Sequence, residues 1–164
     1  MNQKNETDHR AYAYAVMEQA DQHIAGLDEL SAKIQSGSTI ETGAITQLTF
    51  NERSAVERSL QVLAEIAIGC SKHWLRQHQK PVPAESRACI ERVYECLSGK
   101  ALPDIQAMRG AIATRNVIVH DYLNLDWQRI EPVLKQRKYV QVREYIQQLC
   151  QALLKTSTLP EDDV

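Results

Sequence analysis

The feature that most constrains the fold is the regular spacing of apolar residues in segment 56–74. Apolar side chains recur there at alternating steps of four and three residues, at Val56, Leu60, Leu63, Ala67, Cys70 and Trp74. This spacing places all of them on one side of an α-helix, as in a heptad repeat. Val62 and Ile66 widen the apolar side, which predicts a helix that is buried on more than one face.

The ends of this helix and of the one before it are indicated by capping and breaking residues. A first helix is predicted between Asp8, a suitable N-cap, and Gly37, which suits the left-handed position that ends a helix. Residues 38–49, rich in Ser, Thr and Gly, are predicted to form a loop. The second helix should stop before Pro81, because residues that precede a proline avoid the helical conformation.

Shorter helices are predicted in the second half of the chain. One covers about 84–97, and the next begins near Leu102 with Pro103 in its first turn, where the missing N–H costs nothing. Asp126 can cap a further helix, which we expect to be interrupted or kinked near Pro132. The last helix carries an apolar face made of Val142, Ile146, Leu149 and Leu153.

These patterns together predict an all-α fold, because no pair of matching strands is visible in the sequence. Five to six helices with short connections favour an antiparallel up-and-down bundle. The chain has 164 residues, which is enough for one domain with its own core. We assign residues 1–155 to this single domain and residues 156–164 to a flexible acidic C-terminal tail.

Composition and charge limit the kinds of function. The net charge is −2, so the overall field gives no reason to expect nucleic-acid binding, and any site for a polyanion must be local. The 4 cysteines form no CxxC pair, and the N-terminus is too polar for a secretory leader, which indicates a cytoplasmic protein with reduced thiols. No apolar run approaches the length needed to cross a membrane.

The stretch RNVIVHDY, from Arg115 to Tyr122, is the main candidate for a site. Val117, Ile118 and Val119 favour a strand, but the helical pattern that starts near Leu102 continues through them, with apolar-seam positions at Ile105, Met108, Ile112, Arg115, Val119 and Tyr122. Arg115 therefore falls in the middle of an apolar seam. Burying a guanidinium without a partner costs several kcal/mol, so the seam must open there or an anion must meet it.

The position of His120 raises a geometric problem. It follows Arg115 by five residues, a rotation of about 140° on an ideal helix, whereas Asn116 is four residues away and shares its face. Three arrangements would bring Arg115 and His120 together. The helix unwinds near His120, the long arginine wraps around the helix, or a second copy of the chain completes the site.

An arginine and a histidine in one site would suit cleavage of an RNA phosphodiester without a metal. Arginine binds phosphate through a rigid fork of donors, and histidine transfers protons near neutral pH. The RNA 2′-hydroxyl would attack the adjacent phosphorus, His120 would move a proton, and Arg115 would stabilise charge on the phosphoryl oxygens. The alternative for such a pair is a salt-bridged helix end with no catalytic role.

Three segments of the chain carry a resemblance to a known family. RNVIVHDY resembles the RX4HXY motif of the HEPN superfamily, in its HepT-like toxin branch. ERSLQVLAEIA, Glu57 to Ala67, resembles the second helix of that family. LPDIQAMRGAIATRN followed by VHDYLNLDWQRI resembles its motif helix and the next one, so that the similarity covers about residues 8–155. Thr114 departs from the family pattern, and so does the long loop 38–49.

The resemblance implies a dimer in which the motif residues of both chains line a shared cleft. It implies a metal-independent endoribonuclease without a cofactor, in which Arg115 and His120 are catalytic and Asn116 supports them. It also implies a partner, a minimal nucleotidyltransferase antitoxin encoded nearby, which adenylylates the motif tyrosine Tyr122. An AMP group on Tyr122 would add bulk and negative charge beside the phosphate site and so repel RNA.

Other interpretations remain open for several of these residues. Tyr122 is either modified, in contact with RNA, or a core tyrosine with its hydroxyl at the edge. The whole chain is alternatively a non-catalytic HEPN module that binds substrate or nucleotide for a nucleotidyltransferase, or a bundle that only dimerises. A basic stretch is either a solvated helix face or a guide for RNA; it consists of Lys135, Arg137, Lys138 and Arg143. His73 and His78 are five residues apart, which does not suit a metal site.

Overall fold

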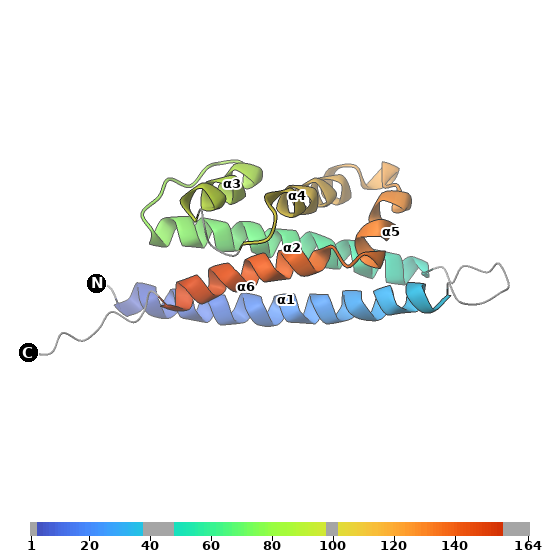
Figure 1. Cartoon of the computed structure of the whole chain (residues 1–164), viewed down its shortest axis with the longest axis horizontal. Coiled ribbons are helices and arrows are strands. Elements are labelled where there is room, and N and C mark those ends of the chain that lie inside the picture. The colour runs from blue at the N-terminus through green and yellow to red at the C-terminus, as the bar shows by residue number, and fades with distance from the viewer. Residues whose placement is uncertain (1–2, 38–47, 98–101, 156–164) are drawn as a thin grey trace, which may run out of the picture.

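The computed structural model describes residues 3–37, 48–97 and 102–155, and within these ranges the fold is all-helical (Figure 1). In the described ranges, six α-helices and one short 3₁₀ turn follow one another. They are α1 (Gln3–Gly37), α2 (Phe50–Gln77), α3 (Ser86–Cys96), α4 (Ile105–His120), η1 (Tyr122–Asn124), α5 (Trp127–Lys135) and α6 (Tyr139–Lys155). The predicted all-α bundle is confirmed. The predicted tail 156–164 and most of the predicted loop 38–49 lie outside the described residues.

Helix α2 lies at the centre of the bundle. It packs against α1 and α6 on one side and against α3 and α4 on the other, and Figure 1 shows the short helices lying across it. All residues of the predicted α2 seam are buried, and so are Val62 and Ile66, which widen it. The prediction of a helix buried on more than one face is therefore confirmed.

The start of α2 is fixed by a capping box. The Thr49 hydroxyl accepts a hydrogen bond from the Glu52 amide at 3.2 Å, and the Glu52 carboxylate accepts one from the Thr49 amide at 2.7 Å. Such a pair of bonds satisfies two of the free amides at a helix start and stabilises the helix by about 1 kcal/mol. Glu52 also pairs with Lys33 of α1, which ties the end of α1 to the start of α2.

Two of the predicted helix boundaries are wrong, and so is one predicted interruption. Asp8 is not an N-cap, because α1 already begins at Gln3. The residues between Gln3 and Asp8 include no Gly or Pro that would prevent this extension of the helix. Pro103 precedes α4 and is not in its first turn, since Asp104 is the N-cap and accepts from the Gln106 amide at 2.9 Å. The predicted interruption at Pro132 is wrong because α5 continues to Lys135, whereas the alternative of a kink there stays a prediction.

Two features explain why α5 continues through its proline. Asp126 caps the helix as predicted, accepting from the Gln128 amide at 2.9 Å. The buried side chains of Ile130 and Leu134, on either side of Pro132, pack into the common core. Tertiary packing of this kind offsets the lost hydrogen bond that a proline imposes on a helix.

Helix α6 closes the core. Its predicted apolar residues Val142, Ile146, Leu149 and Leu153 are all buried, and the helix packs against both α1 and α2. Tyr145 lies fully buried on the same helix, where its hydroxyl is 2.7 Å from Ser71 Oγ of α2. Both hydroxyls of this buried pair therefore have a hydrogen-bond partner where α2 packs against α6.

Candidate active site

The motif RNVIVHDY begins on a continuous α-helix. Helix α4 runs without a break from Ile105 to His120, and Asp121 closes it with a bond from its amide to the Val117 carbonyl at 3.0 Å. The helix therefore does not unwind between Arg115 and His120, which excludes the first of the three arrangements. Tyr122 lies beyond α4, in η1, so that its predicted place on the seam is wrong because the helix ends at His120.

Arg115 is met by a carboxylate from the central helix. Oε1 of Glu65 on α2 accepts from Arg115 Nε at 2.6 Å and lies 2.5 Å from Arg115 Nη2. The Arg115 side chain is 20% exposed and that of Glu65 is 42% exposed, so the pair lies at the edge of the core. Glu65 is thus the anion that the predicted apolar seam required, because it compensates the guanidinium where water is limited.

The guanidinium also contacts the residue next to it. Arg115 Nη1 donates to Oδ1 of Asn116 at 3.0 Å. Asn116 shares its face of α4 with His120, which lies one turn further along. The arginine therefore reaches part of the way around the helix towards the histidine, as in the second predicted arrangement. Within the described part of the chain, no hydrogen bond joins Arg115 to His120 directly.

His120 occupies an accessible position. It is the last residue of α4 and is exposed to solvent, as are Asp121, Leu123 and Asn124 after it. Oδ1 of Asp121 accepts from Asn124 Nδ2 at 2.8 Å, which stabilises the turn that carries Tyr122. The side chain of Tyr122 itself lies outside what the structure describes. The turn therefore places the backbone of the motif tyrosine at the surface, two residues after the histidine.

Helix α2 carries further polar residues at four-residue steps from Glu65. Gln61 and Glu57 precede it at this spacing, which places all three on one side of the helix. Burial raises the pKa of the Glu57 carboxyl, an effect that the nearby Arg53 guanidinium partly offsets. Arg53 in turn lies over the Trp127 ring, 5.5 Å from its centroid, a distance that allows a cation–π contact.

Glu65 is the functional candidate that the sequence interpretation missed. It lies within the quoted segment ERSLQVLAEIA, and the step from Glu57 through Gln61 to Glu65 is the signal that marks a polar side on an otherwise apolar helix. The sequence alone did not show that this polar side of α2 meets α4 at Arg115. That pairing depends on how α2 and α4 pack.

Two further findings concern metals and membranes. Among residues 3–37, 48–97 and 102–155, no group of three or more His, Cys, Asp or Glu side chains is placed to hold a metal ion. His73 is stacked on Tyr12 with ring centroids 3.8 Å apart, whereas His78 Nδ1 lies 2.8 Å from the Trp74 carbonyl. None of the helices in these same ranges is long and apolar enough to span a bilayer.

The fold and the candidate site together define a class: a helical bundle whose motif helix presents an arginine, an asparagine and a histidine, with the arginine paired to a glutamate of the central helix. Comparison with known families shows to which family within that class the chain belongs. The chain belongs to the HepT-like ribonuclease family, because the family model described as Ribonuclease HepT-like matches residues 21–149. The resemblance seen in the sequence is thereby confirmed. Neither curated proteins nor solved structures gave a significant match to the chain.

Proposed function

We propose that the chain is a metal-independent endoribonuclease toxin of a toxin–antitoxin pair, with Arg115 and His120 as its catalytic residues. The observation that carries the proposal is the position of the Arg115 guanidinium, which Glu65 and Asn116 hold on the motif helix. Membership of the HepT-like ribonuclease family supports the activity. The remaining elements of the proposal are the dimeric cleft, the antitoxin and the modification of Tyr122.

The hydrogen-bond inventory of Arg115 leaves it able to bind a phosphate. A guanidinium has five N–H donors. Three nitrogens each use one donor: Nε and Nη2 towards Glu65, and Nη1 towards Asn116. The second N–H of each Nη atom remains available, and two parallel donors are the arrangement that binds two phosphoryl oxygens. A fixed fork of this kind stabilises the charge that develops on a phosphoryl group without having to reorganise.

The proposed reaction needs no nucleophile from the protein. The RNA 2′-hydroxyl attacks the adjacent phosphorus, a bond forms from the 2′-oxygen to phosphorus, and the bond to the 5′-oxygen breaks. The products are a 2′,3′-cyclic phosphate and a 5′-hydroxyl end. His120 transfers a proton, either from the attacking hydroxyl or to the leaving oxygen, and Arg115 stabilises the phosphoryl oxygens.

A second copy of the chain completes the proposed site. Arg115 and His120 lie about 140° apart around α4, so the two groups of one protomer face a common phosphate only in part. In a dimer, the histidine of one protomer is presented to the arginine of the other. The exposed end of α4 and the exposed turn after it are compatible with such a contact.

The same turn provides the proposed point of control. Tyr122 lies in η1, flanked by the exposed residues Asp121 and Leu123, so that a nucleotidyltransferase can reach the turn that carries it. An AMP group attached there would bring a negative charge close to Arg115 and His120. It would compete with the RNA phosphate for the guanidinium and so neutralise the toxin.

Catalysis is tested with purified variants and RNA in the presence of EDTA. Arg115→Ala and His120→Ala should each abolish cleavage and relieve growth arrest on expression, and Arg115→Lys should also be strongly impaired because it keeps the charge but loses the fork. Arg92→Ala, which breaks a surface pair with Glu95 on α3, is the matched control and should cleave normally. Circular dichroism checks that each variant is folded.

The proposed control is tested separately by mass spectrometry. Co-expression with the nucleotidyltransferase encoded nearby should add AMP to Tyr122, and Tyr122→Phe should escape neutralisation. An unmodified tyrosine in a neutralised complex would contradict this part of the proposal while leaving the nuclease activity untouched.

A second candidate function is that of a non-catalytic HEPN module that binds substrate or nucleotide for a nucleotidyltransferase. The observation in its favour is the net charge of −2, which is unusual for a protein that must attract RNA. A wild-type protein that neither cleaves RNA nor arrests growth, but forms a stable complex with the nucleotidyltransferase, would establish this alternative.

A further inference from the structure

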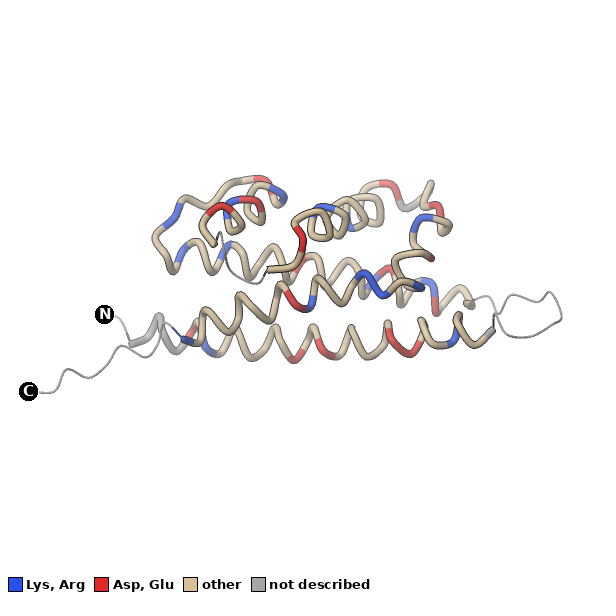
Figure 2. Tube along the Cα trace, viewed as in Figure 1, with Lys and Arg blue, Asp and Glu red and all other residues tan. Residues whose placement is uncertain are grey.

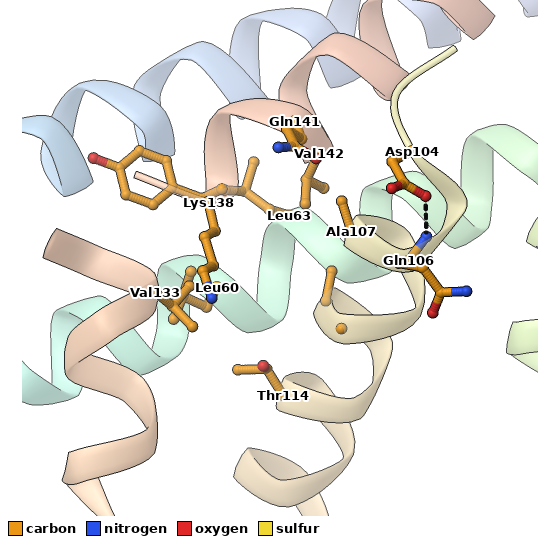
Figure 3. A pocket seen from close by; sticks show the side chains of 13 residues that line it. Leu60, Leu63, Asp104, Gln106, Ala107, Thr114, Val133, Lys138, Gln141 and Val142 are labelled. Carbon is orange, nitrogen blue, oxygen red and sulfur yellow. Dashed lines mark hydrogen bonds between the residues drawn. The ribbon is translucent and has the colours of Figure 1, made fainter. Parts of the chain in front are cut away.

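A cavity of about 520 Å³ lies on the flank of α4 that faces α6 (Figure 3). Its floor is made by Leu60 and Leu63 of α2, and one wall by Val133 of α5 and Val142 of α6. Cavities that bind small molecules have this size and are mostly apolar, with a few polar groups that orient the ligand. The cavity has no role in the proposed cleavage of RNA.

The cavity exists because α4 presents small side chains to it. Ala107, Gly110 and Ala111 line it from α4, together with Thr114 one turn further on. A Cβ atom added to Gly110 would meet no other atom within 4 Å. Space for a Cβ atom is therefore open at this position, beside the other small residues that line the cavity.

Lys138 supplies the charge of the cavity. Among the four members of the basic stretch, Lys135 pairs with Glu131, Arg137 with Asp28, and Arg143 with Asp21. Lys138 makes no ion pair with any described residue, although it lies where α5 turns into α6 and where Figure 2 shows several basic residues gathered. Figure 3 shows its side chain reaching beside Val133 and Leu60, with Thr114 across the cavity.

The turn that carries Lys138 contains a residue in a backbone conformation that is rare for non-glycine residues. Arg137 has a φ of 49°, in the left-handed region that non-glycine residues seldom adopt. Two hydrogen bonds hold it there, from Nε and Nη2 to the two carboxylate oxygens of Asp28, each at 2.9 Å, and the Tyr139 hydroxyl donates to the same carboxylate at 2.6 Å. Contacts with α1 thus fix the turn and with it the base of Lys138.

The far end of the cavity limits the ligand to one negative charge. Asp104 lines that end, where its carboxylate caps α4 by accepting from the Gln106 amide. A second anionic group on a ligand would be repelled there. The cavity therefore fits a molecule with an apolar body and a single acid group placed at Lys138.

We propose that this cavity is a binding site for a small amphipathic monocarboxylate with an aliphatic body. The carboxylate pairs with the Lys138 ammonium and the Thr114 hydroxyl, and the aliphatic part lies over Leu60, Leu63 and Val142. The site is distinct from the catalytic candidates, because Arg115 and His120 point about 100° and about 120° away from Thr114 around α4. The proposal does not depend on the ribonuclease activity.

Binding is tested with octanoate and its uncharged analogue octanamide, by calorimetry and by amide chemical shifts of the labelled full chain. Octanoate should bind saturably and shift the amides of Gly110, Thr114 and Val142. Gly110→Leu, which fills the cavity, should weaken binding of both compounds. Lys138→Gln should weaken octanoate by about tenfold, the value of one charge-assisted contact, and leave octanamide unchanged. Lys135→Gln is the matched control, with no effect on either compound.

Each other outcome overturns the proposal. Absence of saturable octanoate binding to the wild type would end it, and so would binding that Gly110→Leu leaves unchanged. If Lys138→Gln weakens the binding of octanoate and octanamide equally, the Lys138 ammonium does not recognise the carboxylate, and the proposal is refuted. If Gly110→Leu instead changes the molar mass in solution while octanoate fails to bind, the cavity is a contact between copies of the chain. Since Lys138 is exposed and forms no ion pair with any residue that the structure describes, its variant keeps the test valid even if Gly110→Leu does not fold.

Discussion

Glu65 and Arg115 meet where α2 packs against α4, with one carboxylate oxygen 2.6 Å from Nε and 2.5 Å from Nη2 of the guanidinium. Because both contacts use the same oxygen, the carboxylate restrains the plane of the guanidinium, and the bond from Nη1 to Asn116 restrains it further. A group held in this way is ready to receive a phosphate before the substrate arrives. Glu65 is therefore a positioning residue in the proposed reaction.

Substitution of Glu65 should separate positioning from stability. We expect Glu65→Ala to lower kcat for RNA cleavage by about 10²-fold, since a displacement of about 1 Å at a catalytic group has this effect. Glu65→Gln, which keeps an acceptor, should recover part of the rate. Because Glu65 is 42% exposed, the free energy of unfolding should change by less than about 1 kcal/mol.

The control for this prediction is Glu95→Gln, in a surface pair with Arg92 on α3. It removes a carboxylate from an arginine in the same way but lies on a different helix from the motif. Equal loss of activity in Glu65→Ala and Glu95→Gln, or loss that follows stability alone, would show that Glu65 has no positioning role.

Ser71 and Tyr145 should be coupled in stability. Ser71 Oγ donates to the Ala67 carbonyl at 2.8 Å, so the Tyr145 hydroxyl must be the donor in its 2.7 Å bond to Ser71. Ser71→Ala leaves that buried hydroxyl without an acceptor, which should cost about 1–3 kcal/mol. Tyr145→Phe should cost less, because Ser71 keeps its bond to the backbone. Urea unfolding of both variants gives these values.

The double variant Ser71→Ala/Tyr145→Phe distinguishes the hydrogen bond from a loss of packing. It should be less destabilised than the sum of the two single variants, since neither side chain is then left with an unsatisfied group. Strictly additive losses would contradict the assignment of the tyrosine as donor.

Asp28 should make stability depend on acid pH. The hydrogen bond from Arg137 is the main cause that lowers the pKa of this carboxyl below its ordinary value of 3.8, with a further contribution from Tyr139. A lowered pKa in the folded state means that the pairing stabilises the fold above the ordinary value and is lost as the pH falls through the lowered one. Because Asp28 is 37% exposed, the effect should stay below about 1 kcal/mol.

This dependence is measured by comparing Asp28→Asn with the wild type in urea, at neutral pH and at about pH 3. The wild type should be more stable at neutral pH, and the difference should shrink at the lower pH. Asp21 lies on the same helix as Asp28 and pairs with Arg143 of α6. Asp21→Asn therefore provides the comparison with an ion pair to which Tyr139 does not donate. A difference for Asp28→Asn that is constant with pH would refute the prediction.

Two glycines should respond to alanine in opposite directions. A Cβ at Gly110 meets nothing within 4 Å, so Gly110→Ala should stabilise α4 by about 0.5–1 kcal/mol through its helix propensity. At Gly69 the Cβ would lie 2.7 Å from the Tyr12 hydroxyl, whose ring is stacked on His73. Gly69→Ala must displace that ring and should lower the melting temperature. A gain in both variants would contradict the tight contact at Tyr12.

The helices of this bundle were predictable because their apolar spacing is a local property of the chain. The seam of α2 is buried throughout, and the inward residues of α6 are those that the pattern indicated. The seam of α4 was only partly predictable. Met108 and Ile112 are buried as expected, but Ile118 is buried instead of Val119. Since α4 packs against α2, α3 and α6, no single seam describes its contacts.

The candidate site divides in the same way. The positions of Arg115, Asn116 and His120 on one helix followed from the spacing of the motif. The partner of Arg115 did not, because Glu65 is 50 residues away in the chain and reaches it only through tertiary packing. Tyr122 was misplaced because the helical pattern gives no sign that the helix ends at His120. The dimer, the antitoxin and the role of Tyr122 stay predictions.

The packing of α6 against both α1 and α2 has a consequence for how the protein is made. The ribosome releases α1 and α2 long before α6, and until then the apolar faces that α6 covers remain without their partner. A nascent chain that stops before Tyr139 lacks the helix that packs against α1, α2 and α4, and so leaves part of the core uncovered. Such fragments would expose apolar surface to proteases, and the proposed nuclease activity would require α6.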